Sequence, residues 1–137
     1  MSVVTEIIRL ESDQTLSFGN YVVNEKQKVE DFEALGDLYK VKTHKQVTRL
    51  EKNGSLLLEA VPGAAVFNFK EAEDVVTFAM TGFEGTNITV ELESETEYKI
   101  FIDGTNIGIM RSNVGGKISF SIGLSETLQQ VKIEKNA

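Results

Sequence analysis

The stretch YKIFIDGTNIGIMRSNVGGKISFSI, residues 98–122, is the part of the chain that decides the fold. Tyr98, Ile100 and Ile102 recur with a period of two at one end of the stretch, and apolar residues alternate with serines in 118–122 at the other. A period of two is typical of a strand with one buried face. The dipeptide Asp103-Gly104 favours the positive φ angles of a tight hairpin turn. The stretch therefore predicts three successive antiparallel strands joined by short reversals.

The same stretch is rich in glycine, which raises the alternative of a phosphate-binding loop. That motif needs a glycine five residues before Gly116 and a Ser or Thr after Lys117, but Arg111 and Ile118 stand there. A dinucleotide-binding motif opens a helix, whereas these glycines lie between strand patterns. The glycines are therefore interpreted as turn residues, and we expect no cofactor.

The strand pattern extends over most of the chain. Turn dipeptides separate the apolar runs, including Asn53-Gly54 and Pro62-Gly63, the second of which fits a type II turn. About twelve short strands with short connections predict an all-β fold, an antiparallel β-sandwich. We expect one domain over residues 1–137, with a composition shift near residue 70 that indicates two halves of that domain. The predicted strands are 4–10, 15–23, 38–43, 47–52, 55–61, 64–69, 74–82, 86–93, 97–103, 106–111, 117–123 and 129–134.

One segment, near residues 25–35, is compatible with two structures. Asn24 suits a helix N-cap, Val29 and Phe32 are three residues apart, and Gly36 suits a helix end. The alternative is an irregular strand from Val29 to Ala34. The sequence leaves one short helix and a strand as equal interpretations.

Charge and composition exclude several classes of partner. Fourteen basic and 21 acidic residues give a net charge of −7, which repels nucleic-acid backbones. We expect no membrane partner either, since no apolar run is long enough to span a bilayer. The first residues lack the pattern of a secretory signal, and the chain has no cysteine, so a cytoplasmic location is expected.

Catalytic and metal-binding patterns are missing from the sequence. His44 is the single histidine, and nothing around it resembles a nucleophile motif. One histidine and no cysteine do not make the usual zinc site, and no calcium-loop pattern is present. The many acidic residues fall on polar faces or in turns, where water keeps them ionised. We therefore predict a protein that is not an enzyme, with no catalytic residue and no metal.

The most basic segment, YKVKTHKQVTR at residues 39–49, holds the first candidate contact site. Strand alternation places Lys40, Lys42 and His44 on one face and the apolar partners on the other. On an acidic protein this face suits an anion or an acidic glycan. The alternative is the solvated face of an ordinary strand.

The most apolar stretch, AVPGAAVFNF at residues 60–69, lies in a candidate interface that covers residues 56–69. Phe67 and Phe69 are expected to share one face of a strand, and all-β chains of this size often associate through an apolar sheet face. The alternative is an interior strand. The candidate interface residues are Leu56, Leu58, Ala64, Ala65, Phe67 and Phe69.

Two resemblances add expectations about function. Residues 98–134 resemble the last strands of immunoglobulin-like β-sandwich modules appended to bacterial glycosidases and surface proteins. The segments TLSFGNY, GDLYKVKT, EAVPGAAVFNF and GGKISFSI together resemble a family of small uncharacterised all-β proteins from gut clostridia, sometimes labelled endosialidase-like. The second resemblance implies an all-β fold over nearly the whole chain and, through the label, a glycan hydrolase. It assigns no catalytic residue to this sequence.

Three functions follow in order of expectation. The first is a non-catalytic β-sandwich protein that acts by binding or by assembly with itself. The second is a carbohydrate-binding accessory module, which the absence of Trp and the presence of only three Tyr disfavour. The third is the glycan hydrolase that the endosialidase-type label implies.

Overall fold

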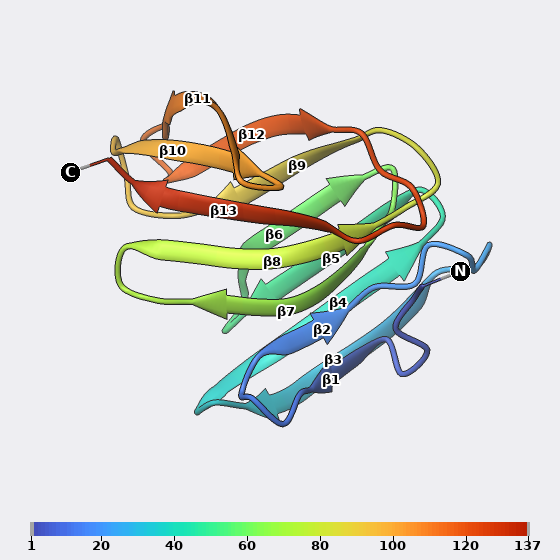
Figure 1. Ribbon diagram of the computed structural model, residues 1–137. Coiled ribbons are helices and arrows are strands. Elements are labelled where there is room, and N and C mark those ends of the chain that lie inside the picture. Colours follow the sequence, from blue (N-terminus) through green and yellow to red (C-terminus); the bar gives the residue numbers. More distant parts are fainter. Residues whose placement is uncertain (1, 137) are drawn as a thin grey trace.

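The computed structural model describes residues 2–136, and in this range the chain is all-β, with no helix. Thirteen strands form two antiparallel sheets that pack as a sandwich, which confirms the predicted class (Figure 1). No helix long and apolar enough to cross a membrane occurs in this range. The strands are β1 Ile8–Leu10, β2 Leu16–Phe18, β3 Gln27–Ala34, β4 Asp37–His44, β5 Val47–Lys52, β6 Ser55–Val61, β7 Ala65–Glu71, β8 Val75–Thr81, β9 Thr86–Glu91, β10 Glu97–Ile102, β11 Thr105–Arg111, β12 Lys117–Ile122 and β13 Gln129–Lys135.

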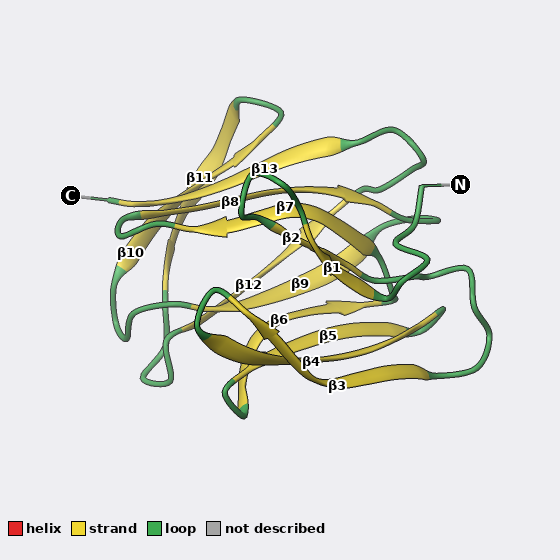
Figure 2. Cartoon of the chain, turned by 90° about the horizontal axis from the view of Figure 1, so that it is seen from below, coloured by secondary structure: helices red, strands yellow, loops and turns green. Residues whose placement is uncertain are grey.

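The two sheets have seven and six strands and lie face to face (Figure 2). The seven-stranded sheet has the order β1-β2-β7-β8-β13-β10-β11, and the six-stranded sheet has the order β12-β9-β6-β5-β4-β3. In each sheet the strands up to residue 71 lie together on one side, and the strands from residue 75 on lie together on the other. One hydrophobic cluster runs between the sheets and includes residues from both sides.

The alternating pattern of the sequence places the core residues. On β12, Ile118, Phe120 and Ile122 are buried, and the two serines between them are exposed. On β10, Tyr98 and Ile100 are buried in the same core. Burying one face of each sheet against the other supplies most of the driving force for this fold.

The segment near residues 25–35 is the strand β3, so the helix alternative is wrong. β3 pairs with β4, and the register shifts between Val29 and Phe32, where Asp31 has a φ of 54°. A bulge inserts an extra residue into a strand, so side chains three apart come to point the same way. Both Val29 and Phe32 pack against the core. The three-residue spacing that suggested a helix is therefore the signature of the bulge.

A second bulge corrects the predicted face of Phe67. The register of β7 against β8 shifts between Phe67 and Lys70, and Asn68 has a φ of 56°. As a result Val66 and Phe69 belong to the core, while Phe67 is half-buried outside it. The expectation that Phe67 and Phe69 share a face is wrong because the bulge breaks the alternation between them.

Two of the predicted turns are tight hairpins. Asn53 and Gly54 join β5 to β6, and Asp103 and Gly104 join β10 to β11. All four residues have positive φ, which is the conformation that Asn-Gly and Asp-Gly favour. The stretch 98–122 contains three strands in succession, but only β10 and β11 pair with each other. The expectation of three antiparallel strands joined by short reversals is wrong for the third, because β12 crosses to the six-stranded sheet and pairs with β9.

Candidate functional site

The candidate site lies at one end of the sandwich, where loops from both sheets meet. Because every pairing is antiparallel, β4, β6 and β8 all end at the same end of the molecule, which is also the end at which the N-terminus lies (Figure 1). The loops that follow these strands are residues 45–46, 62–64 and 82–85. Loops grouped at one end of a rigid sandwich are the usual place for a binding site in such folds.

These loops surround a cavity of about 520 Å³ that is open to solvent. This volume lies within the range of small-molecule sites. The cavity is lined by Lys45, Gln46, Pro62, Gly63, Phe83 and Glu84.

Close packing of two loops forms the floor of this cavity. Gly63 donates its N–H to the carbonyl of Lys45 at 3.0 Å, and a Cβ on Gly63 would collide with the carbonyl oxygen of His44. The φ of Gly63 is not positive, so the predicted type II turn is wrong, and the peptide bond before Pro62 is cis. Glycine is required at position 63 by the close approach of the backbones and not by its φ angle.

Buried hydroxyls hold the same loop from below. The Thr48 hydroxyl donates to the carbonyl of Ala64 at 2.7 Å and accepts the N–H of Ala64 at 3.2 Å. The Thr86 hydroxyl donates to the carbonyl of Pro62 at 2.5 Å. Both threonines are buried, so these bonds fix the loop on β5 and β9 before any ligand arrives.

Phe83 is an exposed aromatic ring at the wall of the cavity. Its side chain is 46% exposed, and its ring packs edge-on against the fully buried Tyr21, with centroids 5.0 Å apart and an interplanar angle of 84°. The Lys45 Nζ lies 5.6 Å from the centroid of the Phe83 ring. Edge-to-face packing on a buried ring limits the rotation of Phe83 and leaves part of it in contact with water.

The polar side chains of the cavity have free hydrogen-bonding groups. Lys45 and Gln46 are exposed donors, and Glu84 is an exposed acceptor. Among residues 2–136, none of these three side chains forms an ion pair or a hydrogen bond. The site therefore combines one apolar surface with donors and an acceptor that a ligand can use.

The basic residues predicted from sequence lie beside this site but do not line it. Lys40, Lys42 and His44 are half-buried on the outer face of the six-stranded sheet, while Tyr39 and Val41 are in the core. The Lys40 Nζ lies 4.0 Å from Glu30, which places it in an ion pair on that face. The backbone of His44 packs closely against Gly63, and the next residue, Lys45, lines the cavity.

Most of the predicted interface residues lie inside the chain's own core. Leu58, Ala64, Ala65 and Phe69 are buried within the single chain, whereas Leu56 and Phe67 are half-buried. A partner would therefore meet only the last two of these six side chains. The apolar character of segment 56–69 is explained by the sandwich interior.

Five carboxylates line a smaller hollow, of about 260 Å³, at the opposite end of the sandwich. Glu71 pairs with Lys52 at 3.2 Å, and Glu93 pairs with Lys135 at 2.6 Å. None of the five carboxylates is buried, so the hollow lacks the desolvated acid that glycoside hydrolysis requires. The carboxylates are those of Glu71, Glu73, Asp74, Glu91 and Glu93.

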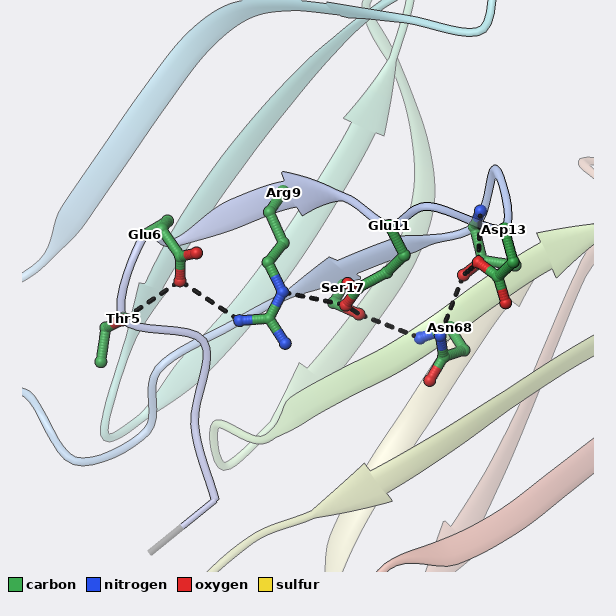
Figure 3. A network of polar contacts seen from close by, with 8 residues as sticks. Thr5, Glu6, Arg9, Glu11, Asp13, Ser17 and Asn68 are labelled. Atoms are coloured by element: carbon green, nitrogen blue, oxygen red, sulfur yellow. Dashed lines mark hydrogen bonds and ion pairs between the residues drawn. The ribbon is translucent and has the colours of Figure 1, made fainter.

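A chain of polar contacts on the first two strands is structural (Figure 3). Arg9 donates to Glu11 at 2.9 Å and to Glu6 at 3.2 Å, and the Ser17 hydroxyl donates to Glu11 at 2.5 Å. Ser17 in turn accepts the backbone N–H of Asn68 at 3.1 Å, in the bulge of β7. Ser17 is fully buried, so this network braces the edge of the sheet and offers no accessible nucleophile.

Acid should weaken this network. The Ser17 hydroxyl and then the Arg9 guanidinium lower the pKa of Glu11 below its ordinary value. A lowered pKa in the folded state means that the stabilisation is complete above the unfolded pKa and is lost as pH falls through the folded pKa. We expect Glu11→Gln to lower the melting temperature at pH 7 and to have a much smaller effect at about pH 3. Thermal unfolding followed by circular dichroism at both pH values measures this, and an equal loss at both would contradict it.

The sequence contains weak signals for the cavity residues. Phe83 lies in the segment FEG, whose sequence predicts only a turn between two strands. Lys45 is one of several cations that flank His44. Residues 45, 62 and 83 come together only because three strands end at the same level, which a single sequence does not reveal.

Comparisons with known proteins give no information about the function of this chain. No protein-family model matches the chain, and neither a curated protein nor a solved structure gives a significant match.

Proposed function

We propose that this chain is a non-catalytic binding module that holds a carbohydrate in the cavity at the loop end of the sandwich. The observation that carries this proposal is Phe83, an exposed aromatic ring fixed beside unpaired polar side chains. Among residues 2–136, Phe83 is the only aromatic side chain that is exposed, and aromatic side chains are common in the lining of ligand cavities.

A carbohydrate is the ligand class whose chemistry fits these groups. Sugar rings present C–H faces that pack on aromatic rings, and they present hydroxyls that both donate and accept hydrogen bonds. Lys45 and Gln46 supply donors, and Glu84 supplies an acceptor, all on the rim of the same cavity. The loops are already fixed by Thr48 and Thr86, so binding requires little ordering of the protein.

The test is a glycan array followed by titration of the best binder into labelled protein by NMR. We expect a binder whose affinity falls at least about fivefold in Phe83→Ala, which corresponds to the loss of about 1 kcal/mol from the aromatic contact. The chemical-shift changes should centre on residues 45–46, 62–63 and 83–84.

The chain offers a matched control in Phe101. This phenylalanine is half-buried on the outer face of the seven-stranded sheet, where the Lys132 Nζ lies 4.5 Å from its ring centroid. It therefore has the same Lys–Phe pairing away from the cavity, and Phe101→Ala should leave glycan binding unchanged. An array without binders, or equal binding by the Phe83→Ala variant, would overturn the proposal.

A further inference from the structure

The turn between β5 and β6 contains the one Asn-Gly dipeptide of the chain, Asn53-Gly54. Asparagine is a chemically labile residue, and a following glycine has no side chain to shield its backbone nitrogen from the asparagine amide. Both residues are exposed, and no atom lies within 4 Å of the position of a Cβ on Gly54. Water therefore reaches this turn, and nothing crowds the backbone at Gly54.

The reaction open to such a dipeptide is deamidation by water. After hydroxide removes its proton, the backbone nitrogen of Gly54 attacks the side-chain carbonyl carbon of Asn53. The bond from that carbon to the side-chain nitrogen breaks, and the nitrogen takes up a proton and leaves as ammonia. Water then opens the cyclic imide at either of its carbonyl carbons, which gives aspartate or isoaspartate. The whole reaction consumes one water molecule and releases one ammonia, with no oxidant or reductant.

The folded chain holds the Asn53 side chain on the neighbouring strand. The Asn53 Oδ1 accepts the N–H of Leu38 at 3.0 Å, and the Asn53 Nδ2 donates to the Asp37 Oδ1 at 2.9 Å. The backbone N–H of Asn53 also donates to the carbonyl of Leu38 at 2.7 Å. All these bonds end at the start of β4, so they direct the side-chain amide at β4 and away from the nitrogen of Gly54.

We propose that Asn53 is a deamidation site, and that its hydrogen bonds to Asp37 and Leu38 keep it unreactive while the start of β4 is folded. The reaction then proceeds through a local opening in which both side-chain bonds are broken. Hydrogen bonds at the surface give limited protection, because water competes for the same groups. The site is therefore slow in the folded chain and fast in the unfolded chain.

The product acts back on the fold. Aspartate at position 53 replaces the donor Nδ2 with an anionic oxygen, which faces the Asp37 carboxylate at hydrogen-bond distance. The Lys52 Nζ lies 3.7 Å from the Asp37 Oδ2 and 3.2 Å from the Glu71 Oε1, so it already serves two carboxylates. Isoaspartate, in addition, lengthens the backbone of a two-residue turn. Either product loosens the start of β4, and the lost ammonia makes the change irreversible.

Peptide mapping by mass spectrometry during incubation in mildly alkaline buffer measures the rate at Asn53. We expect this rate to be at least about tenfold lower in the folded chain than in urea, where no hydrogen bond holds the side chain. Asp37→Ala should raise the folded-state rate at least about threefold, because it removes the acceptor of the Asn53 Nδ2. The same variant should leave the rate in urea unchanged.

Glu71→Ala is the matched control, because Glu71 also pairs with Lys52. Among the residues that the structure describes, Glu71 forms no hydrogen bond with Asn53, so this variant should leave both rates unchanged. Asp37→Asn should retain the protection, since an amide oxygen still accepts from the Asn53 Nδ2. Circular dichroism shows whether each variant is folded. A folded chain that reacts as fast as the chain in urea, or an Asp37→Ala variant no faster than Glu71→Ala, would overturn the proposal.

Thermal unfolding of Asn53→Asp tests the effect of the product without any incubation. We expect a lower melting temperature at neutral pH, because two carboxylates then face each other. Adding Asp37→Asn to the same chain should restore most of the loss, since the introduced amide donates to the new carboxylate. A loss that Asp37→Asn does not reduce would contradict the proposed repulsion.

These tests are independent of the proposed glycan site. β5 runs from the loop end of the sandwich to the opposite end, so the turn at Asn53 lies far from the cavity around Phe83. Asn53→Asp should therefore bind glycan normally. A glycan array without binders would leave the expected deamidation rates unchanged, and equal rates in urea and in the folded chain would leave glycan binding unchanged.

Discussion

Gly116→Ala is expected to destabilise the protein by about 3–5 kcal/mol, whereas Gly104→Ala should cost only about 1–2 kcal/mol. Both glycines have a φ of 82°, so alanine brings the same backbone strain at each position. At Gly104 no atom lies within 4 Å of the new Cβ. At Gly116 the Cβ would collide with the carbonyl oxygen of Leu92, whose N–H donates to the Gly116 carbonyl at 2.6 Å.

Urea unfolding of the two variants measures this difference. Both variants carry the same backbone strain, because both glycines have the same φ. The additional loss of unfolding free energy in Gly116→Ala therefore measures the effect of the collision alone. Equal losses of unfolding free energy in the two variants would show that the backbone at Leu92 can move away from the new Cβ. This result would contradict the close packing of Gly116 against Leu92.

Phe78→Ala should cost about 3–5 kcal/mol of unfolding free energy, while Phe83→Ala should cost less than about 1 kcal/mol. Phe78 is 2% exposed on β8, and its ring lies 5.7 Å from that of Phe69 within the core. Truncation there removes buried apolar surface and leaves a cavity between the sheets. Phe83, in contrast, keeps nearly half of its surface in water.

Chemical denaturation of both variants checks this prediction, and the unchanged chain is the reference. A small loss of unfolding free energy in Phe78→Ala would mean that the core collapses to fill the space of the missing ring. A large loss of unfolding free energy in Phe83→Ala would mean that the loop end depends on this ring for folding. The second result would also remove Phe83→Ala as a clean probe of binding.

The strands and hairpins were predictable because they depend on local patterns. Alternation in β10 and β12 marks the buried face, and Asp103-Gly104 marks the turn between two strands. Both signals lie within a few residues of the structure that they specify.

The failures of prediction occur where one inserted residue breaks the pattern. At Asp31 and at Asn68 a bulge shifts the alternation, which disguised β3 as a helix candidate and put Phe67 on the wrong face. Nothing in the sequence distinguishes an apolar strand that packs inside its own chain from one that packs on a partner. For this reason segment 56–69 suggested an interface, although Leu58 and Phe69 belong to the core.

The direction of the last strand has a practical consequence for measuring binding. β13 runs from the loop end toward the opposite end of the sandwich, so Asn136 lies far from the cavity around Phe83 (Figure 1). If the protein is attached to a sensor surface through a tag after residue 137, the cavity points into the solution. The Thr81 hydroxyl at the end of β8 donates to the carbonyl of Ser2 at 2.6 Å, so Ser2 lies at the loop end. Attachment through an N-terminal tag therefore holds the loop end near the surface, and the two orientations should report different apparent affinities for a large glycan.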